Sequence, residues 1–264
     1  MASTIKILCV GDIVGRPGRD VLQSELAAIQ RDYQIDLTIA NIENAAGGFG
    51  VTPKIYQELG KLPIQVFTSG NHIFDKHESL DQFPNMPKII RPVNYPPGAP
   101  GEGVKYIQWN THKLAVVNVI GRVFMHNYDC PFRALDSVLP PILEQTNLII
   151  VDFHAEVTSE KQAMGWNLDG KVSAMYGTHT HVQTADDRIL PNGTAYISDI
   201  GMTGPANGII GMVKEPVLHR FRTQLPVRME PDHNRPYQFN GIKLTLSLDT
   251  GKALEIERIQ RTIK

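Results

Sequence analysis

The sequence predicts an α/β fold of four layers (α-β-β-α), in which two mixed β-sheets pack face to face with helices outside. Two observations predict it: short β-rich runs alternate with helical stretches over the first two thirds of the chain, and hairpins dominate the last third. No stretch of linker composition divides the 264 residues, so we predict a single domain over residues 1–264.

The first half of the chain carries three predicted strands and two helices. Ile5–Val10 is a continuous apolar run that ends at Gly11, which is typical of a strand buried on both faces. Thr52 and Pro53 are a good N-cap and a good first helical residue. In chain order we expect strand Ile5–Val10, helix Asp20–Tyr33, strand Leu37–Ala40, helix Pro53–Leu59 and strand Gln65–Ser69.

The second half begins with one hairpin and ends with two more. Its one predicted helix contains Pro140 and Pro141, which lack a backbone N–H and are expected to strain or break the helix. In chain order we expect hairpin strands Val104–Trp109 and Lys113–Ile120, helix Phe132–Gln145, strands Leu148–Phe153 and Val172–Tyr176, a hairpin around Pro191–Gly193, and hairpin strands Ile242–Leu248 and Ala253–Ile259.

The composition is that of an ordinary globular protein, with 42% hydrophobic residues and a formal net charge of −1. That charge gives no support to binding of RNA or of an anionic membrane by the overall field. Two cysteines form no disulfide framework, the first residues lack the apolar stretch of a signal peptide, and no apolar run is long enough to span a membrane. We therefore expect a cytoplasmic protein, and whether it forms a homo-oligomer is left open.

Polar residues with metal-binding side chains follow five of the predicted strands. In open α/β sheets the ligand site lies just beyond the carboxyl ends of the strands, so these residues are expected to converge at one edge. They are Asp12, Glu43 and Asn44, Asn71 and His72, His154, and lastly His179 and His181. Because His179 and His181 lie two residues apart, an extended strand would point both toward the same side.

These side chains form a mixed oxygen and nitrogen ligand set without a thiolate. Such a set suits Mn, Fe, Zn or Co better than Ca or Mg, which prefer oxygen alone. There are enough groups for two ions, with one carboxylate as a bridge. Two ions clamp the attacking and leaving oxygens of a displacement at phosphorus and lower the pKa of a bound water from about 15.7 towards ~7. The residues therefore predict a dinuclear-metal phosphoesterase that attacks with a hydroxide held between the ions, with Fe or Mn as the expected metal and Zn as the next choice.

Four motifs resemble those of calcineurin-like metallophosphoesterases and occur in the same order. They are GDIVG at Asp12, GNHIFD at Asn71 and His72, DFHAE at His154, and GTHTH at His179 and His181. Most of that superfamily has D-x-H in the first motif and GD-x-x-D in the second, whereas this chain has DIV and IENAAGG. The YmdB-type group of bacterial phosphodiesterases shares both departures, and the chain resembles that group over most of its length.

The resemblance implies the superfamily's fold and a division of the ligands between two ions. One ion would be bound by Asp12, Glu43, Asn44 and His181, and the other by Glu43, Asn71, His154 and His179. His72 would stay unligated and donate a proton to the leaving alkoxide, a contribution of ~10²–10⁴-fold in rate. The substrates implied are phosphodiesters, including 2′,3′-cyclic nucleotides.

Each residue also has an ordinary structural interpretation. Asp12 taken alone is typical of a helix N-cap or a turn, and Glu43 and Asn44 are typical of a polar turn. His154 is compatible with a buried core histidine, or with a residue that orients a ligand together with Asp152. Only their common position at strand ends favours metal binding over these alternatives.

Three further features of the sequence each have two possible interpretations. Asp75 either orients His72 or caps a helix. Arg16 either contacts a substrate phosphate or is a solvated loop charge. The glycine-rich run Ile200–Met212 either lines the pocket with backbone N–H groups or forms a tight turn.

Two other functions are compatible with the same residues. A phosphomonoesterase or 5′-nucleotidase would favour additional Arg or Lys side chains for the extra negative charge, and only Arg16 is a nearby candidate. A non-catalytic, metal-dependent regulatory or RNA-binding protein would have a closed and ligand-saturated metal site, in which the spare His72 has no use.

Overall fold

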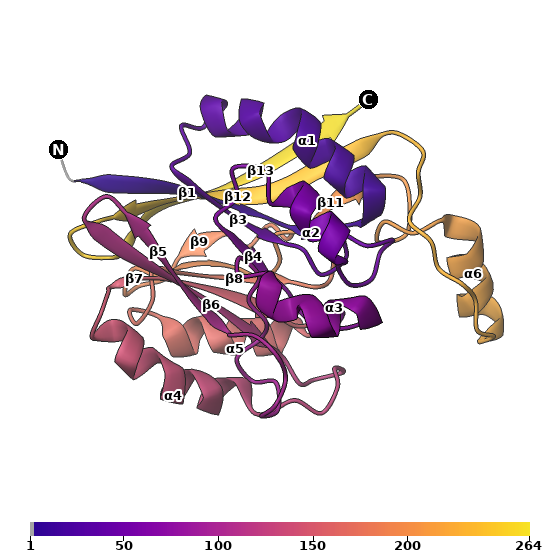
Figure 1. The fold of residues 1–264 in the computed structure, drawn as a ribbon. Helices are drawn as coiled ribbons and strands as arrows, with labels where there is room; N and C mark the ends of the chain where they lie inside the picture. Colours follow the sequence, from indigo (N-terminus) through magenta and orange to yellow (C-terminus); the bar gives the residue numbers. More distant parts are fainter. Residues whose placement is uncertain (1–2) are drawn as a thin grey trace.

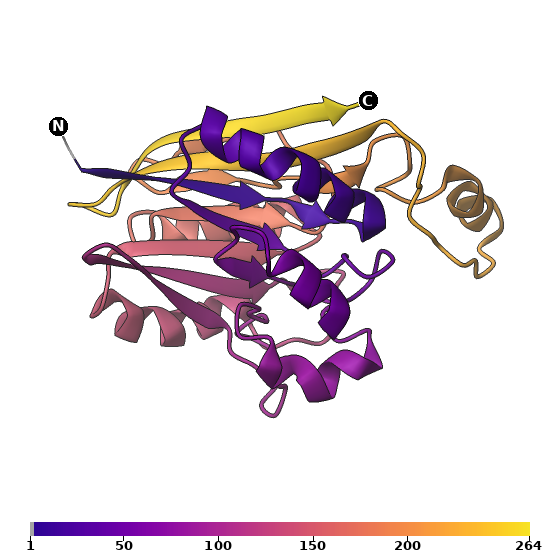
Figure 2. The same cartoon turned by 45° about the horizontal axis from the view of Figure 1, so that its top comes forward.

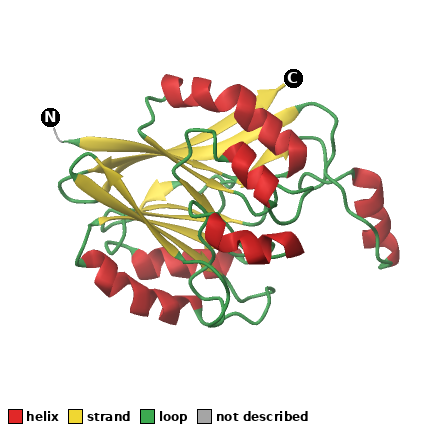
Figure 3. Cartoon of the chain, viewed as in Figure 1, coloured by secondary structure: helices red, strands yellow, loops and turns green. Residues whose placement is uncertain are grey.

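The computed structural model describes residues 3–264, and its helices lie outside two β-sheets that pack against each other (Figures 1 and 3). The strands of the first sheet are β1 Thr4–Val10, β2 Asp12–Ile13, β3 Leu37–Asn41, β4 Val66–Thr68, β11 Met202–Pro205, β12 Tyr237–Ser247 and β13 Ala253–Ile263. Those of the second are β5 Val104–Trp109, β6 His112–Ile120, β7 Leu148–His154, β8 Ala174–Thr178, β9 Arg188–Ile189 and β10 Ala195–Ile197. The helices are α1 Gly15–Asp32, α2 Pro53–Leu59, α3 His77–Gln82, α4 Pro131–Leu143, α5 Thr158–Leu168 and α6 Lys214–Thr223, with a 3₁₀ turn at Phe83–Asn85.

Both sheets are mixed. The first has the order β2-β11-β12-β1-β3-β4, with β13 beside β12, and the second has the order β5-β6-β7-β8-β10-β9. Strand β1 runs parallel to β3 but antiparallel to β12, and β6 runs parallel to β7 but antiparallel to β5. Helices α1 and α2 cover the outer face of the first sheet, and α4 and α5 cover that of the second (Figure 1). The predicted four-layer α/β fold is confirmed.

Strand β1 shows how the apolar pattern produces the layers. Its side chains alternate between two cores, with Ile5, Ile7 and Cys9 between the two sheets, and Leu8 and Val10 under the helices. Successive residues of a strand face opposite sides, so a strand covered on both faces must be apolar at nearly every position. This burial explains the continuous apolar run from which the strand was predicted.

The predicted strands correspond closely to the observed ones, and most of their ends agree within two residues. The last hairpin is longer than predicted, because β12 begins at Tyr237 and β13 ends at Ile263. Thr52 caps α2, accepting a hydrogen bond at Oγ1 from the Ile55 backbone N–H (3.2 Å). Cys9 and Cys130 are both free, and within residues 3–264 no helix is long and apolar enough to cross a membrane.

The expectation that prolines would break the helix in the second half is wrong. Helix α4 continues through Pro140 and Pro141 to Leu143. The carbonyls that lose a partner belong to Asp136 and Ser137, and both residues are solvent-exposed. Solvent can therefore reach this side of the helix, which tolerates the two missing N–H groups.

Five of the helices and strands have no counterpart in the prediction: α3, α5, α6, β2 and β11. Helix α6 projects from the body of the molecule at the edge where the glycine-rich segment emerges (Figure 2). Its Phe221 is 71% exposed, and its Val217 is buried against Val14, Met202 and Met212. The helix is therefore anchored at one apolar contact and extends from there into solvent.

Candidate metal centre

All of the polar residues predicted to converge do so at the carboxyl ends of the strands. Asp12 opens β2 after β1, and Glu43 and Asn44 follow β3; Asn71 and His72 follow β4, His154 ends β7, and His179 and His181 follow β8. The first sheet thus supplies five of these residues and the second sheet three. A pocket of about 230 Å³ opens beside them, with Glu43, His72, His179 and His181 among its lining residues.

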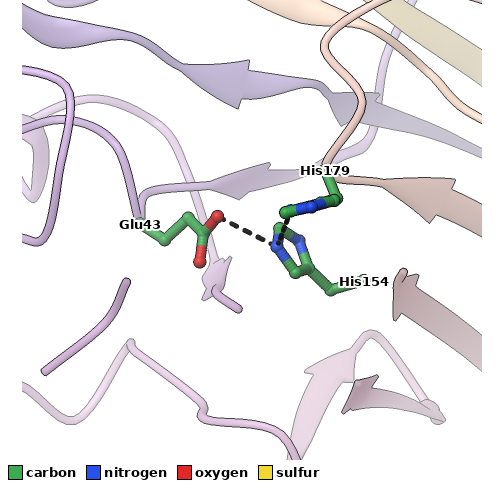
Figure 4. A group of neighbouring side chains, drawn as sticks. All are labelled: Glu43, His154 and His179. Atoms are coloured by element: carbon green, nitrogen blue, oxygen red, sulfur yellow. Dashed lines mark hydrogen bonds and ion pairs between the residues drawn. The ribbon is translucent and has the colours of Figure 1, made fainter. Parts of the chain in front are cut away.

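One group of four side chains centres on His154. The Nε2 atom of His154 lies 3.0 Å from Glu43 Oε1, 2.9 Å from Asn71 Oδ1 and 3.0 Å from His179 Nδ1. Figure 4 shows Glu43 and His179 pointing at the same ring nitrogen. One N–H group makes a good hydrogen bond to only one acceptor. The three acceptor-type atoms around His154 Nε2 therefore cannot all be satisfied by one proton. The group has the composition and closeness of a cation site.

A second group contains Asn44 and His181 and also lies beside Glu43. Asn44 Nδ2 is 3.1 Å from His181 Nε2 and 3.4 Å from Glu43 Oε1. Asp12 Oδ2 accepts a hydrogen bond from the His179 backbone N–H (3.2 Å), whereas Asp12 Oδ1 is buried and has no partner within residues 3–264. A half-turn of the Asn44 amide exchanges its oxygen and nitrogen ends, so that Oδ1 would face His181.

Neighbouring groups fix which nitrogen of each imidazole faces the site. Thr178 Oγ1 lies 2.9 Å from His154 Nδ1 and donates to Asp152 Oδ1 (2.7 Å). His181 Nδ1 lies 2.9 Å from the Ile210 carbonyl, which must accept its proton. Metal-binding histidines usually donate their second N–H to an oxygen in this way. His154 and His181 are thereby oriented with Nε2 toward the other polar groups.

Glu156 orients the third histidine and was not predicted as a site residue. Its Oε2 lies 3.1 Å from His179 Nε2, so that His179 Nδ1 faces His154. The signal available in the sequence was its position two residues after His154. Asp152 supports His154 indirectly, through the hydroxyl of Thr178.

The carboxylates and imidazoles of the site shift one another's pKa values strongly. Burial lowers the pKa of His154, but the charge and hydrogen bond of Glu43, together with the charges of Asp12 and Asp152, raise it to about 9. Burial raises the pKa of Glu43, but the charges and hydrogen bonds of His154 and His72 together lower it to about 2. Burial and the same imidazolium lower the pKa of His179 to about 3. The buried carboxylates therefore favour one positive charge among them. In the folded chain a proton on His154 provides this charge.

His72 lies at the pocket wall and belongs to neither group. Its Nδ1 is 2.7 Å from Asp75 Oδ2, and its side chain is 28% exposed. Its backbone N–H donates to Glu43 Oε2 (3.0 Å), and its ring packs edge-on against Phe49 with centroids 4.9 Å apart. Of the two interpretations of Asp75, the orienting one agrees with this geometry.

The reason given for pairing His179 and His181 is wrong. Strand β8 ends at Thr178, and both histidines have positive φ angles of +102° and +65°, so neither lies in an extended strand. His179 faces His154, whereas His181 faces Asn44. The tight loop after β8 therefore sends the two rings to different groups.

The structure also bears on the alternatives for Arg16 and for the glycine-rich run Ile200–Met212. Arg16 lies outside the pocket lining, 73% exposed and with its Nε 3.6 Å from Asp20 Oδ2, which is the geometry of a solvated loop charge. The glycine-rich run does reach the pocket, where Ile210 and Met212 are part of the lining. Its contact with His181 is made by the Ile210 carbonyl and not by an N–H group.

The residues present fit transition-metal ions. The two groups together offer carboxylate, amide and imidazole atoms, most of them buried, and both lie beside Glu43. The unpartnered Oδ1 of buried Asp12 is the strongest local indication, because a buried carboxylate oxygen without a hydrogen bond is costly unless a cation binds it. Oxygen and nitrogen donors without sulfur suit Mn, Fe or Zn.

Comparison with known proteins gives close relatives over the whole chain. A family model described as YmdB-like protein matches residues 8–259. The 2′,3′-cyclic-nucleotide 2′-phosphodiesterase of Bacillus subtilis (strain 168) is 46% identical over 255 residues, which are 97% of this chain and 96% of the relative.

Solved structures agree with this relationship. A novel phosphatase from Mycoplasma pneumoniae has a TM-score of 0.93 at 33% identity, covering 99% of this chain and 95% of that chain. A hypothetical protein from Thermus thermophilus has a TM-score of 0.91 at 37% identity, covering 98% of this chain and 100% of that chain. The fold, the order of the site residues and these matches lead to one conclusion: the chain belongs to the YmdB-like protein family.

Proposed function

We propose that this chain is a phosphodiesterase that uses two transition-metal ions, with Fe or Mn as the expected metal, and that its substrates are nucleotides, in particular 2′,3′-cyclic nucleotides. The broad enzyme class, a phosphoric ester hydrolase, is that of its close relatives. The single observation that carries the proposal is the cluster of carboxylate, amide and imidazole groups around Glu43 and His154 beside an open pocket.

The proposed ligands follow the two groups. Asp12, Glu43, Asn44 and His181 would hold one ion, and Glu43, Asn71, His154 and His179 would hold the other, with Glu43 as the bridge. When bound, two such ions make hydroxide available near neutral pH and neutralise negative charge on the phosphoryl group. The chain itself holds these side chains buried and oriented, through Thr178, Ile210 and Glu156.

His72 is the proposed proton donor to the leaving oxygen. Its ring lies in the pocket wall, it is not in either ligand group, and Asp75 holds its Nδ1. Because Asp75 contacts Nδ1, Nε2 is the ring nitrogen that would face a substrate. Proton transfer from a positioned imidazole contributes about 10²–10⁴-fold to such a reaction.

The pocket wall supports a nucleotide substrate. Besides the polar groups it is lined by apolar side chains: Phe49, Ile210, Met212 and Met229. A ligand that combines a phosphoryl group with a flat, partly apolar base matches this mixture of lining residues. The B. subtilis relative is named for action on 2′,3′-cyclic nucleotides, which have this shape.

The charge around the pocket favours diesters over monoesters. The residues that line the pocket within the described chain include no Lys or Arg, and Glu156 adds a carboxylate that is 49% exposed. A monoester carries a second negative charge at neutral pH and would face this carboxylate without a compensating cation. We therefore rank the phosphomonoesterase or 5′-nucleotidase second.

The test is a comparison of three substrates at matched Mn²⁺ concentration: 2′,3′-cyclic AMP, 3′-AMP and 5′-AMP. We expect kcat/KM for the cyclic diester to exceed that for either monoester by at least about tenfold, with turnover abolished by a chelator and restored by Mn²⁺. A clear preference for a monoester would refute the substrate proposal. Two bound metal ions without turnover of any ester would instead favour the non-catalytic regulatory or RNA-binding alternative.

A further inference from the structure

Lys161 is a fully buried lysine in α5 that the proposed mechanism does not use. Its side chain is 1% exposed. Its Nζ donates to Asp199 Oδ2 (2.7 Å) and to the backbone carbonyl of Thr178 (2.9 Å). A buried ammonium is costly and persists only when it is paired and hydrogen-bonded, so this arrangement calls for an explanation.

Asp199 links Lys161 to a further residue of the same loop. Besides Lys161, its Oδ2 accepts from the Thr180 backbone N–H (3.0 Å) and from Thr180 Oγ1 (2.8 Å). Its Oδ1 accepts from the Gly201 backbone N–H (2.8 Å). The ion pair therefore holds the residue before His179 and the residue after it.

The loop between these two anchors has an unfavourable backbone. His179 and His181 have φ angles of +102° and +65°, a region that side chains other than glycine rarely adopt. Such conformations persist when the surroundings over-determine them, and they concentrate at functional sites. In this loop the surroundings include the ion pair, which contacts the alternate residues Thr178 and Thr180.

We propose that Lys161 and Asp199 are positioning residues that clamp the loop at 178–181 and so deliver one histidine to each proposed metal ion. The inference rests on the ligand groups of the proposed function. Neither residue is a proposed ligand, and both act through the backbone of the loop. His179 turns to His154 and His181 to Asn44 only while the residues between them keep this conformation.

The proposal has a signature that distinguishes it from general stabilisation. Loss of one ligand, such as His154, removes a donor from one ion. Loss of the clamp releases His179 and His181 together, so the affinity for both ions falls. A defect that only lowers the stability of the fold leaves both affinities unchanged under conditions in which the variant is fully folded.

The experiment compares K161M and the double variant K161M/D199N with T194V. Methionine keeps the length and burial of the lysine without its charge, and the double variant leaves no buried unpaired carboxylate. Thr194 is a matched control, because its buried hydroxyl joins the other ends of the same helix and strand, donating to the backbone carbonyls of Leu168 (3.3 Å) and Val172 (2.7 Å). All variants are studied at a temperature where circular dichroism and near-UV spectra match those of the wild type.

Three quantities are measured: amide hydrogen exchange of the 178–182 segment without metal, Mn²⁺ affinity of both equivalents by chelator competition, and turnover of 2′,3′-cyclic AMP at saturating Mn²⁺. For both clamp variants we expect exchange of the loop amides at least about tenfold faster, and both Mn²⁺ affinities weaker by about 10–100-fold, as for residues that orient metal ligands. We expect T194V to stay within about twofold of the wild type in all three.

Clamp variants that match T194V in loop exchange and in Mn²⁺ affinity would overturn the proposal. Weakening of only one Mn²⁺ equivalent would overturn it as well. Failure of the proposed function is recognised separately, by the wild type alone: a wild type that binds Mn²⁺ without ester turnover refutes the function, while exchange and affinity still test the clamp.

Discussion

His72 differs from the seven proposed ligands in what its ring contacts. The rings of His154, His179 and His181 each face another proposed ligand, whereas the His72 ring contacts Asp75 and Phe49. A ligand and a proton donor are therefore distinguishable by substitution. A ligand is needed for metal content, and a donor only for turnover.

We predict that His72→Ala keeps the metal content of the wild type and lowers kcat by about 10²–10⁴-fold, because the leaving oxygen loses its proton source. His77→Ala is the control, since His77 is exposed, lies outside the pocket lining and follows closely in the chain. Elemental analysis and steady-state kinetics give the two quantities. Unchanged turnover in His72→Ala would remove this residue from the mechanism, and loss of metal would make it a ligand.

At the scale of single residues, most members of the candidate site could be predicted from the sequence. The contacts that hold their side chains in place could not. The position of a His or Asp at a strand end is visible in the sequence, because the strand is visible as an apolar run. Lys161 and Asp199 lie 38 residues apart and meet only in the folded protein. The loop angles of His179 and His181 also depend on that contact, which is why the strand-based reason for this pair was wrong.

At the scale of elements, the end of β4 must pass very close to the end of β7. Gly70 follows β4, and a Cβ atom at this position would overlap the ring of His154. The adjacent Asn71 reaches His154 Nε2 only because glycine allows this approach. One small residue thus sets the spacing between a strand of the first sheet and a strand of the second.

We predict that Gly70→Ala displaces the His154 ring and reduces bound Mn²⁺ from two equivalents to one, at a cost of about 1–3 kcal/mol in unfolding free energy from overpacking. Gly98→Ala is the control, because Gly98 has a positive φ of +98° but open space around it. Urea unfolding and metal analysis measure the two effects. If Gly70→Ala binds two equivalents with wild-type affinity, the close approach has no role in the site.

The two longest helices that escaped prediction, α5 and α6, share a physical cause. Strands that are buried on both faces can be recognised in the sequence as apolar runs, as β1 and β7 can. Helix α5 buries Glu160 and Lys161 beside Met164 and Leu168, so its inward face carries charge and shows no apolar stripe. Helix α6 is mostly exposed, with Val217 as its buried residue, and so lacks a stripe as well.

At the scale of the whole molecule, the site exists because two sheets meet. The first sheet positions Asp12, Glu43 and Asn71, and the second positions His154 and His179. The core between the sheets, which includes Ile7, Val116, Ile150 and Leu244, holds these two sets in register. The order of the layers could be predicted from the succession of strands, helices and hairpins. The strand order within each sheet could not, because it depends on pairs such as β1 and β12 that are far apart in the sequence.

The central claim is that the two sheets together hold two ions that share Glu43. It is tested most directly by elemental analysis of protein loaded with Mn²⁺ and freed of excess metal, for the wild type, His154→Ala and His181→Ala. We predict about two ions per chain in the wild type and about one in each variant, because each substitution removes a ligand from a different ion. One ion or none in the wild type, or two ions retained in both variants, would contradict the account.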